Sequence, residues 1–163
     1  MKQLLVIRHA KSSWANIGQQ DFDRSLNERG HHDAPEMAKR LLNKKIEIDA
    51  FISSPAVRAL TTATYFAKAY NKTLEDIEQI KRLYHAPSNV FFDVIQTIDP
   101  AITTASLFAH NPGITDFVLN LNTINITNMP TCGVFGVKLH TNDWSAIHTC
   151  KKEFWFFDYP KLD

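Results

Sequence analysis

The sequence has few cysteines, almost no net charge and no long apolar run, and each of these shortages excludes a class of protein. Its two cysteines, Cys132 and Cys150, form no Cys-x-x-Cys pair and no disulfide framework, so they fit the reducing cytoplasm. A formal net charge of +1 leaves no broad basic surface for nucleic acid or an anionic membrane. No stretch approaches the roughly 18 apolar residues of a membrane span or the core of a signal peptide. We therefore expect a cytoplasmic protein that binds neither nucleic acid nor membrane.

The length and composition are those of a globular protein. With 163 residues, of which 44% are hydrophobic and 21% charged, the chain can bury a substantial core. It contains no internal repeat, low-complexity tract or linker. We expect residues 1–163 to form a single domain.

Strand-like and helix-like segments alternate along the chain. Short runs rich in β-branched and aromatic residues are typical of buried strands, and apolar residues at helical spacing separate them. This alternation predicts an α/β fold with a mainly parallel sheet. The predicted strands are 4–7, 49–52, 78–83, 103–109, 133–139 and 153–159, and the predicted helices are 28–43 after an N-cap at Asn27, 55–70, 88–98 and 114–121.

Three of the predicted strands end in cationic or hydrogen-bonding residues. The first ends at Arg8 and His9, the second leads through two serines to a helix that carries Arg58, and another ends at His110. The carboxyl ends of parallel strands lie along one edge of a sheet, where ligands bind in open α/β folds. Helix starts near Pro55 and Pro112 would add backbone N–H groups at that edge. The pattern predicts a local anion site.

The residue types suit phosphate chemistry. The planar fork of arginine matches phosphate oxygens, and neighbouring cations disfavour the charged form of a histidine, which leaves a nitrogen free as a nucleophile. Taken alone, Arg58 would be interpreted as a solvated first-turn arginine and His110 as a core histidine, so the prediction rests on the joint pattern. The other histidines show neither His-x-x-x-His spacing nor a partnering cysteine, so we expect no metal site. They are His31, His32, His85, His140 and His148.

The order of these segments resembles the histidine phosphatase superfamily, which has the phosphoglycerate mutase-like fold. The resemblance is carried by Arg8-His9-Ala10, Ser53-Ser54-Pro55 with Arg58-Ala59 and Thr62, and His110 before Asn111-Pro112-Gly113. Within the superfamily, the series from Arg8 to Trp14 and the segment Asp21-Phe22-Asp23-Arg24 are most similar to the SixA-like phosphohistidine phosphatases. The resemblance implies a three-layer α/β sandwich around a mainly parallel central sheet.

The resemblance also implies roles for single residues. His9 would be the nucleophile and be phosphorylated transiently, while Arg8, Arg58 and His110 would hold the phosphoryl oxygens and neutralise charge in the transition state. Ser12 stands where the superfamily often has a phosphate-contacting serine or threonine, and Asn16 falls one residue later than the usual asparagine. No metal or other cofactor is implied.

The expected substrate is a phosphohistidine-bearing protein, because the chain has little length for a lid over the pocket. Superfamily members that cleave esters generally have a carboxylic acid near the pocket, and the corresponding stretch here, 82–87, has none. Asp21, Asp23 and His85 stay open as possible acids, although the favoured interpretation is that the two aspartates shape their loop through side-chain turns. The alternatives are a phosphatase or mutase acting on small phosphorylated metabolites and a non-catalytic phosphate-binding scaffold. Nothing in the sequence indicates the oligomeric state.

Overall fold

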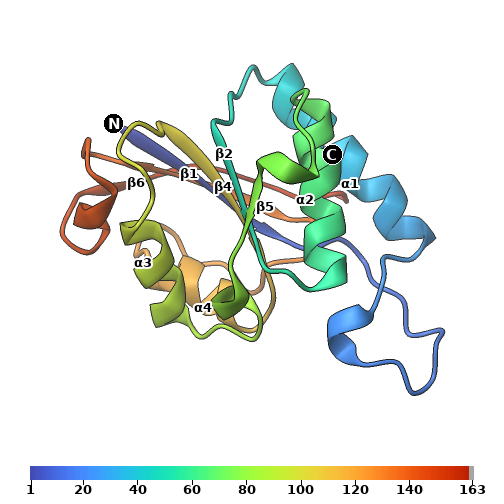
Figure 1. The fold of residues 1–163 in the computed structure, drawn as a ribbon. Coiled ribbons are helices and arrows are strands. Elements are labelled where there is room, and N and C mark those ends of the chain that lie inside the picture. The colour runs from blue at the N-terminus through green and yellow to red at the C-terminus, as the bar shows by residue number, and fades with distance from the viewer. Residues whose placement is uncertain (162–163) are drawn as a thin grey trace.

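A six-stranded sheet in the order β3-β2-β4-β1-β5-β6 crosses the computed structural model, which describes residues 1–161 (Figure 1). The four strands from β3 to β1 are mutually parallel, whereas β5 runs antiparallel to β1 and to β6. The predicted, mainly parallel sheet is therefore confirmed. The strands are β1 (Lys2–Arg8), β2 (Ala50–Ser53), β3 (Ile77–Gln79), β4 (Thr104–Ala109), β5 (Val134–Leu139) and β6 (Lys152–Asp158).

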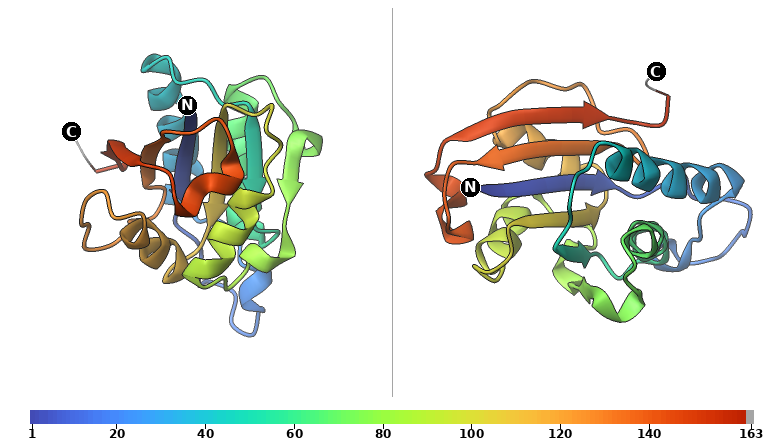
Figure 2. Two further views of the ribbon diagram at one scale, coloured as in Figure 1. Left: turned by 90° about the vertical axis from the view of Figure 1, so that its left-hand side faces the viewer. Right: turned by 90° about the horizontal axis from the view of Figure 1, so that it is seen from above.

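Helices cover both faces of this sheet and complete the three expected layers. Helices α1 (Glu28–Asn43) and α2 (Val57–Ala69) lie on one face, and α3 (Ser88–Gln96) and α4 (Gly113–Asn120) lie on the other (Figures 1 and 2). Successive side chains of a strand point to opposite faces, so β1 contributes to two hydrophobic cores. Leu5 and Ile7 pack with α1 and α2, and Leu4 and Val6 pack with α3 and α4. None of the helices in residues 1–161 is long and apolar enough to cross a membrane.

The predicted strand over 78–83 is wrong in its extent. Strand β3 covers only Ile77–Gln79, and a short 3₁₀ helix, η3 (Lys81–Leu83), follows it. The strand that pairs with β3 is β2, which ends at Ser53. The Ser53 carbonyl accepts the Ile80 N–H at 2.9 Å, and beyond this bond β3 has no strand residue of β2 to pair with. The chain then turns toward the carboxyl edge of the sheet.

The four predicted helices are present, and their ends differ from the predicted ones by up to two residues; α3, for example, ends at Gln96 rather than at residue 98. The Asn27 side chain accepts the Gly30 N–H at 2.9 Å, which confirms the predicted cap of α1. Helix α2 begins at Val57, two residues after the predicted Pro55, because the Ser54 hydroxyl accepts the Ala56 N–H at 3.2 Å and forms a bend first.

Gly113 gives a first testable prediction, because it brings α4 into close contact with the segment after β3. A Cβ at this position would lie 1.8 Å from the Ala86 carbonyl oxygen and 3.3 Å from the Phe91 ring. We expect Gly113→Ala to lower the free energy of unfolding by about 1–3 kcal/mol, the usual cost of overpacking. Urea unfolding measures this change. Asp116→Ala, on the exposed side of the same helix, is the matched control and should cost less than about 1 kcal/mol; equal losses would contradict the prediction.

Candidate active site

The carboxyl ends of β1, β2 and β4 bring four of the predicted residues together. These strands are neighbours in the sheet, so the segments that follow them converge on one cavity of about 270 Å³. The His9 and His110 rings lie 5.2 Å apart between centroids. The cavity is lined by Arg8, His9, Lys11, Ser12, Trp14, Asp21, Arg24, Arg58, His85, His110, Asn111 and Thr131.

His9 is held as a neutral ring, and one of its nitrogens makes no hydrogen bond to residues 1–161. Its side chain is buried, and its Nδ1 lies 2.7 Å from the Ala10 carbonyl oxygen. A carbonyl can only accept, so Nδ1 carries the ring proton and Nε2 keeps its lone pair. Burial, together with the positive charges of Arg58 and Arg8, lowers the pKa of His9 to about 3, although the bond to Ala10 acts in the opposite direction. The neutral ring is therefore the form present near pH 7.

The backbone beside His9 is tied to α2. The Ala10 N–H donates to the Thr62 hydroxyl at 2.9 Å, and that hydroxyl donates to the Arg58 carbonyl at 2.8 Å. Thr62 is fully buried, so these bonds are shielded from water. They fix the end of β1 against the helix that carries Arg58.

His110 is a second neutral ring. Its Nε2 lies 2.8 Å from the Ser54 hydroxyl oxygen. Its buried Nδ1 has no hydrogen-bond partner within the part of the chain that the structure describes. Burial, followed by the neighbouring His9 and Arg58, lowers the pKa of His110 to about 2. The ring can therefore act as a hydrogen-bond partner without adding charge.

Arg8 brings an uncompensated cation to the cavity. One of its terminal nitrogens donates to the Met129 carbonyl at 2.9 Å, while its buried Nε has no partner among residues 1–161. Burial and the charge of Arg58 lower its pKa. An anion in the cavity would relieve the repulsion between these arginines.

Asp21 lies inside the cavity, contrary to the favoured interpretation of it as a loop-shaping residue. One carboxylate oxygen accepts from Arg58 at 2.9 Å and from the Tyr84 hydroxyl at 2.6 Å, and the other accepts from Arg24 at 3.0 Å. Burial alone would raise its pKa, but the bonds from Tyr84, Arg24 and Arg58 outweigh burial and hold the pKa below its usual range. The sequence could not show this, because the residues that surround Asp21 come from distant segments.

The remaining predicted residues divide into two groups. Ser12 is buried at the cavity wall, where its hydroxyl accepts from Arg24, and the His85 Nε2 lies 3.8 Å from the Asp21 carboxylate. Asn16 and Asp23 are exposed and are not among the residues that line the cavity. The structure therefore brings Ser12 and His85 to the site and leaves Asn16 and Asp23 outside it.

Arg24 is the main residue that reasoning from strand ends missed. It lies within an irregular segment of the sequence and is 7% exposed, with hydrogen bonds to Ser12, Asp21 and the Ser13 carbonyl. An isolated bridge between Ser12 and Leu26 folds its segment back onto the end of β1. The one available signal was its place in the segment Asp21–Arg24 that carried the family resemblance.

The charges of the cavity favour a phosphate. Three guanidinium groups, from Arg8, Arg24 and Arg58, face one carboxylate, and the rings of His9 and His110 beside them are neutral. A bound phosphoryl dianion would neutralise the remaining positive charge. No group of three or more potential metal ligands occurs within residues 1–161.

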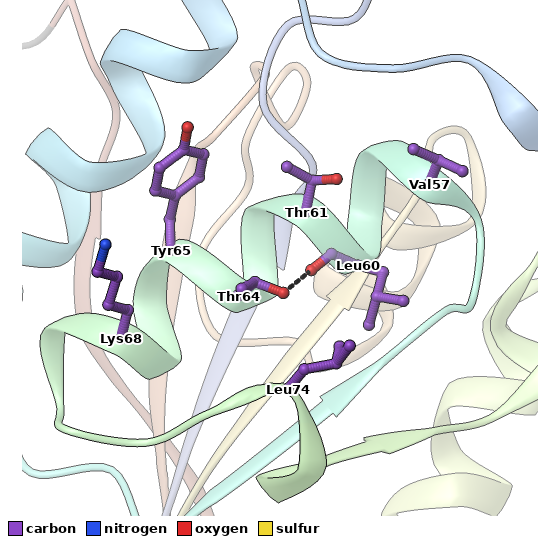
Figure 3. Close-up of a pocket in the computed structure, with 7 residues that line it drawn as sticks. All are labelled: Val57, Leu60, Thr61, Thr64, Tyr65, Lys68 and Leu74. Atoms are coloured by element: carbon purple, nitrogen blue, oxygen red, sulfur yellow. Dashed lines mark hydrogen bonds between the residues drawn. The ribbon is translucent and has the colours of Figure 1, made fainter.

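A larger hollow lies on α2 but has different chemistry. It measures about 440 Å³ and is lined by Val57, Leu60, Thr61, Thr64, Tyr65, Lys68 and Leu74 (Figure 3). Its side chains are mainly apolar, and Lys68 is the one charged group in this lining. Its lining contains neither a histidine nor an arginine, so the smaller cavity, where both residue types meet, is the candidate active site.

Asp21 gives a second prediction, because its carboxylate anchors two of the arginines. We expect Asp21→Asn to lower kcat by about tenfold or more, since hydrogen bonds between charged groups contribute about 1.5–3 kcal/mol. Initial rates at saturating p-nitrophenyl phosphate measure the loss, and thermal unfolding shows whether the variant is folded. The matched control is Asp23→Asn, whose side chain lies outside the cavity and whose kcat should stay unchanged. A kcat for Asp21→Asn within twofold of the wild type would contradict the prediction.

Comparisons with known proteins show which proteins this chain is similar to. Phosphoserine phosphatase 1 of Hydrogenobacter thermophilus is 32% identical over 87 residues, which cover 52% of this chain and 40% of that protein. The fold is similar to that of a protein assigned as the phosphohistidine phosphatase SixA of Agrobacterium tumefaciens, with a TM-score of 0.82, 24% identity and 98% of each chain covered. It is also similar to protein histidine phosphatase SixA complexed with tungstate, with a TM-score of 0.81, 20% identity and 97% of each chain covered.

A family comparison gives the broader assignment. The model of the histidine phosphatase superfamily (branch 1) matches residues 4–84, about half of the chain, and this segment contains Arg8, His9 and Arg58. Membership in this family supports phosphatase activity. With the family match and the phosphoglycerate mutase-like architecture in agreement, the chain belongs to the histidine phosphatase superfamily.

Proposed function

We propose that this protein is a phosphatase that hydrolyses phosphohistidine on a protein, through a covalent phosphohistidine at His9. The observation that carries the proposal is the state of His9, a neutral ring with Nδ1 bound to a carbonyl and Nε2 unblocked, beside three arginines. The same proposal treats residues 1–163 as one histidine phosphatase domain.

In the first step, the Nε2 lone pair of His9 attacks phosphorus. A new P–N bond forms at His9 while the P–N bond to the substrate imidazole breaks, and the departing ring keeps that electron pair. Arg8, Arg58 and His110 hold the phosphoryl oxygens, and the guanidinium groups neutralise the negative charge of the transition state. Arg24, which is hydrogen-bonded to Ser12, adds a third positive charge beside the phosphoryl group.

In the second step, water attacks the phosphorus of phospho-His9. The bond to Nε2 breaks, the phosphoryl group leaves with the water oxygen and its protons as inorganic phosphate, and the His9 ring is neutral again, still hydrogen-bonded to Ala10. The hydrogen bond from Nδ1 keeps the ring in one tautomer and orientation through both steps, which preserves alignment for the in-line displacement.

The leaving group decides between phosphohistidine and phosphate esters. An alkoxide is a poor leaving group that needs a proton in the transition state, whereas a phosphorylated imidazole can be protonated on its other nitrogen and leave as a neutral ring. Asp21 cannot supply this proton near pH 7, because its carboxyl is held ionised, and Asp23 is outside the cavity. The site as a whole favours cleavage of P–N bonds.

One sequence comparison supports a second candidate function, the hydrolysis of small phosphate esters. The relative from Hydrogenobacter thermophilus is a phosphoserine phosphatase by name, and the match covers 40% of its length. An enzyme that acts on small phosphate esters would need an acid, for which His85 at the cavity wall is the available side chain. A non-catalytic scaffold is less favoured, because phosphate binding alone does not require the free Nε2 of His9.

The test is a comparison of kcat/KM for a phosphohistidine peptide, p-nitrophenyl phosphate and a sugar phosphate. Because the leaving groups differ in their need for a proton, we expect kcat/KM to be highest for the peptide, lower for p-nitrophenyl phosphate and lowest for the sugar phosphate. The value for the sugar phosphate should be at least about tenfold below that for the peptide. A sugar phosphate that equals or exceeds the peptide would support the metabolite alternative, and loss of that activity in His85→Ala would identify the acid. Phosphate binding without turnover of any of the three would support the scaffold.

A further inference from the structure

Two large apolar side chains stand in solvent beside the mouth of the active-site cavity. Trp14 is 75% exposed and Ile17 is fully exposed, whereas the next most exposed large apolar residue, Met1, is 50% exposed. Both lie in the segment between β1 and the short helix η1 (Asp21–Asp23). Single exposed apolar residues are normal, but these two lie three positions apart on one segment beside the site, and apolar surface that gathers beside a site marks an interaction surface.

The Trp14 ring is held in this exposed position. The Arg24 guanidinium stacks on it, with its central carbon 3.3 Å from the ring centroid. Arg24 is fixed in turn by a 3.1 Å bond to the Ser13 carbonyl, and the Ser13 hydroxyl accepts the Ala15 N–H at 3.0 Å. Because the ring is already ordered, a partner could bind it at a small cost in conformational entropy.

The positions of Trp14 and Ile17 determine how large a substrate must be to contact both of them. Trp14 lines the cavity together with His9, whereas Ile17 does not. Three residues of extended chain span at most about 10 Å, so Ile17 is close to the mouth but outside it. A molecule the size of free phosphohistidine would contact the cavity wall, while a polypeptide around that phosphohistidine would extend over Trp14 and Ile17.

We propose that Trp14 and Ile17 form a docking surface for the protein substrate and bind apolar side chains that flank its phosphohistidine. Tryptophan is among the residues that most often dominate binding energy at protein interfaces. Lys11 lies on the same rim, exposed and with no acidic partner in the described chain, so its charge disfavours substrates with basic flanks. This inference rests on the proposed function, since it requires a polypeptide substrate.

Two synthetic phosphohistidine peptides of about eleven residues test the docking surface. Both peptides have the same central phosphohistidine. One carries leucine and the other serine at the positions three and four residues away on both sides, a spacing that reaches Ile17. We expect the wild type to prefer the leucine peptide by about five- to tenfold in kcat/KM, mainly through KM, because burial of an apolar side chain is favourable. Ile17→Asp should remove this preference and leave kcat/KM for free phosphohistidine within twofold of the wild type.

Leu74→Asp is the matched control. Leu74 is also apolar and 45% exposed, but it belongs to the hollow on α2, so this variant should keep the preference for the leucine peptide (Figure 3). Equal turnover of the two peptides by the wild type, or an unchanged preference in Ile17→Asp, would overturn the docking surface. Loss of the preference in Leu74→Asp alone would place docking on α2 instead. Failure of the wild type to hydrolyse phosphohistidine in any form would overturn the proposed function as well.

Discussion

Replacement of His9 with alanine is expected to abolish turnover while the protein stays folded. The variant loses the nitrogen that we propose as the nucleophile, and loss of a nucleophile typically costs more than about 10⁴-fold in rate. Within residues 1–161 its buried ring makes one polar contact, with the carbonyl of the neighbouring residue, so the fold does not depend on it. Initial rates with the phosphohistidine peptide and p-nitrophenyl phosphate measure the loss, and circular dichroism checks the fold.

The intermediate itself can be detected. Wild-type enzyme quenched during turnover of ³²P-labelled substrate should carry label that survives base and is lost in acid, as expected for phosphate bound to nitrogen. His9→Ala should carry none. His32→Ala is the matched control, because the side chain of His32 is exposed and contributes nothing to the cavity. Full activity or unchanged labelling in His9→Ala would contradict the role proposed for His9.

Replacement of Arg58 has the second largest expected effect. Arg58 is 5% exposed and points into the cavity from the first turn of α2, where its charge lowers the pKa of both active-site histidines. Removal of one preorganised donor from a transition state costs about 2.7–4 kcal/mol, which is about 10²–10³-fold in rate. We expect Arg58→Ala to lower kcat/KM by at least this factor, as measured with p-nitrophenyl phosphate.

Two further variants separate charge from geometry. Arg58→Lys keeps the positive charge but loses the planar fork that bonds the Asp21 carboxylate and backbone carbonyl, so it should recover little of the activity. Arg82→Ala removes an exposed arginine paired with Asp93 and should leave the rate unchanged. A change of less than about threefold in Arg58→Ala, below roughly 1 kcal/mol, would mean that Arg58 does not act on the transition state.

The sequence by itself determined the class of fold and pointed to four site residues, three at strand ends and one, Arg58, in the helix that follows β2. The short β-branched run that ends at Arg8 and His9 can be recognised from the local sequence. The alternation of strands and helices then implies a parallel sheet, in which Arg58 and His110 lie at the same carboxyl edge as Arg8 and His9. The edge strand after residue 76 was predicted too long, since strand length there depends on where the neighbouring β2 ends, and the sequence of the segment does not contain that information.

Only the tertiary structure decided the rest of the site. Asp21 and Arg24 lie in an irregular segment without periodicity, and their positions follow from long-range contacts: the bridge between Ser12 and Leu26, and the bonds of Asp21 to Arg58 and Tyr84. The tautomer of His9 and the low pKa of both histidines likewise depend on burial and on arginines that are distant in the sequence. The physical reason is general: strand ends are placed by the regular geometry of the sheet, whereas loops and protonation states are set by whichever distant groups the fold packs against them.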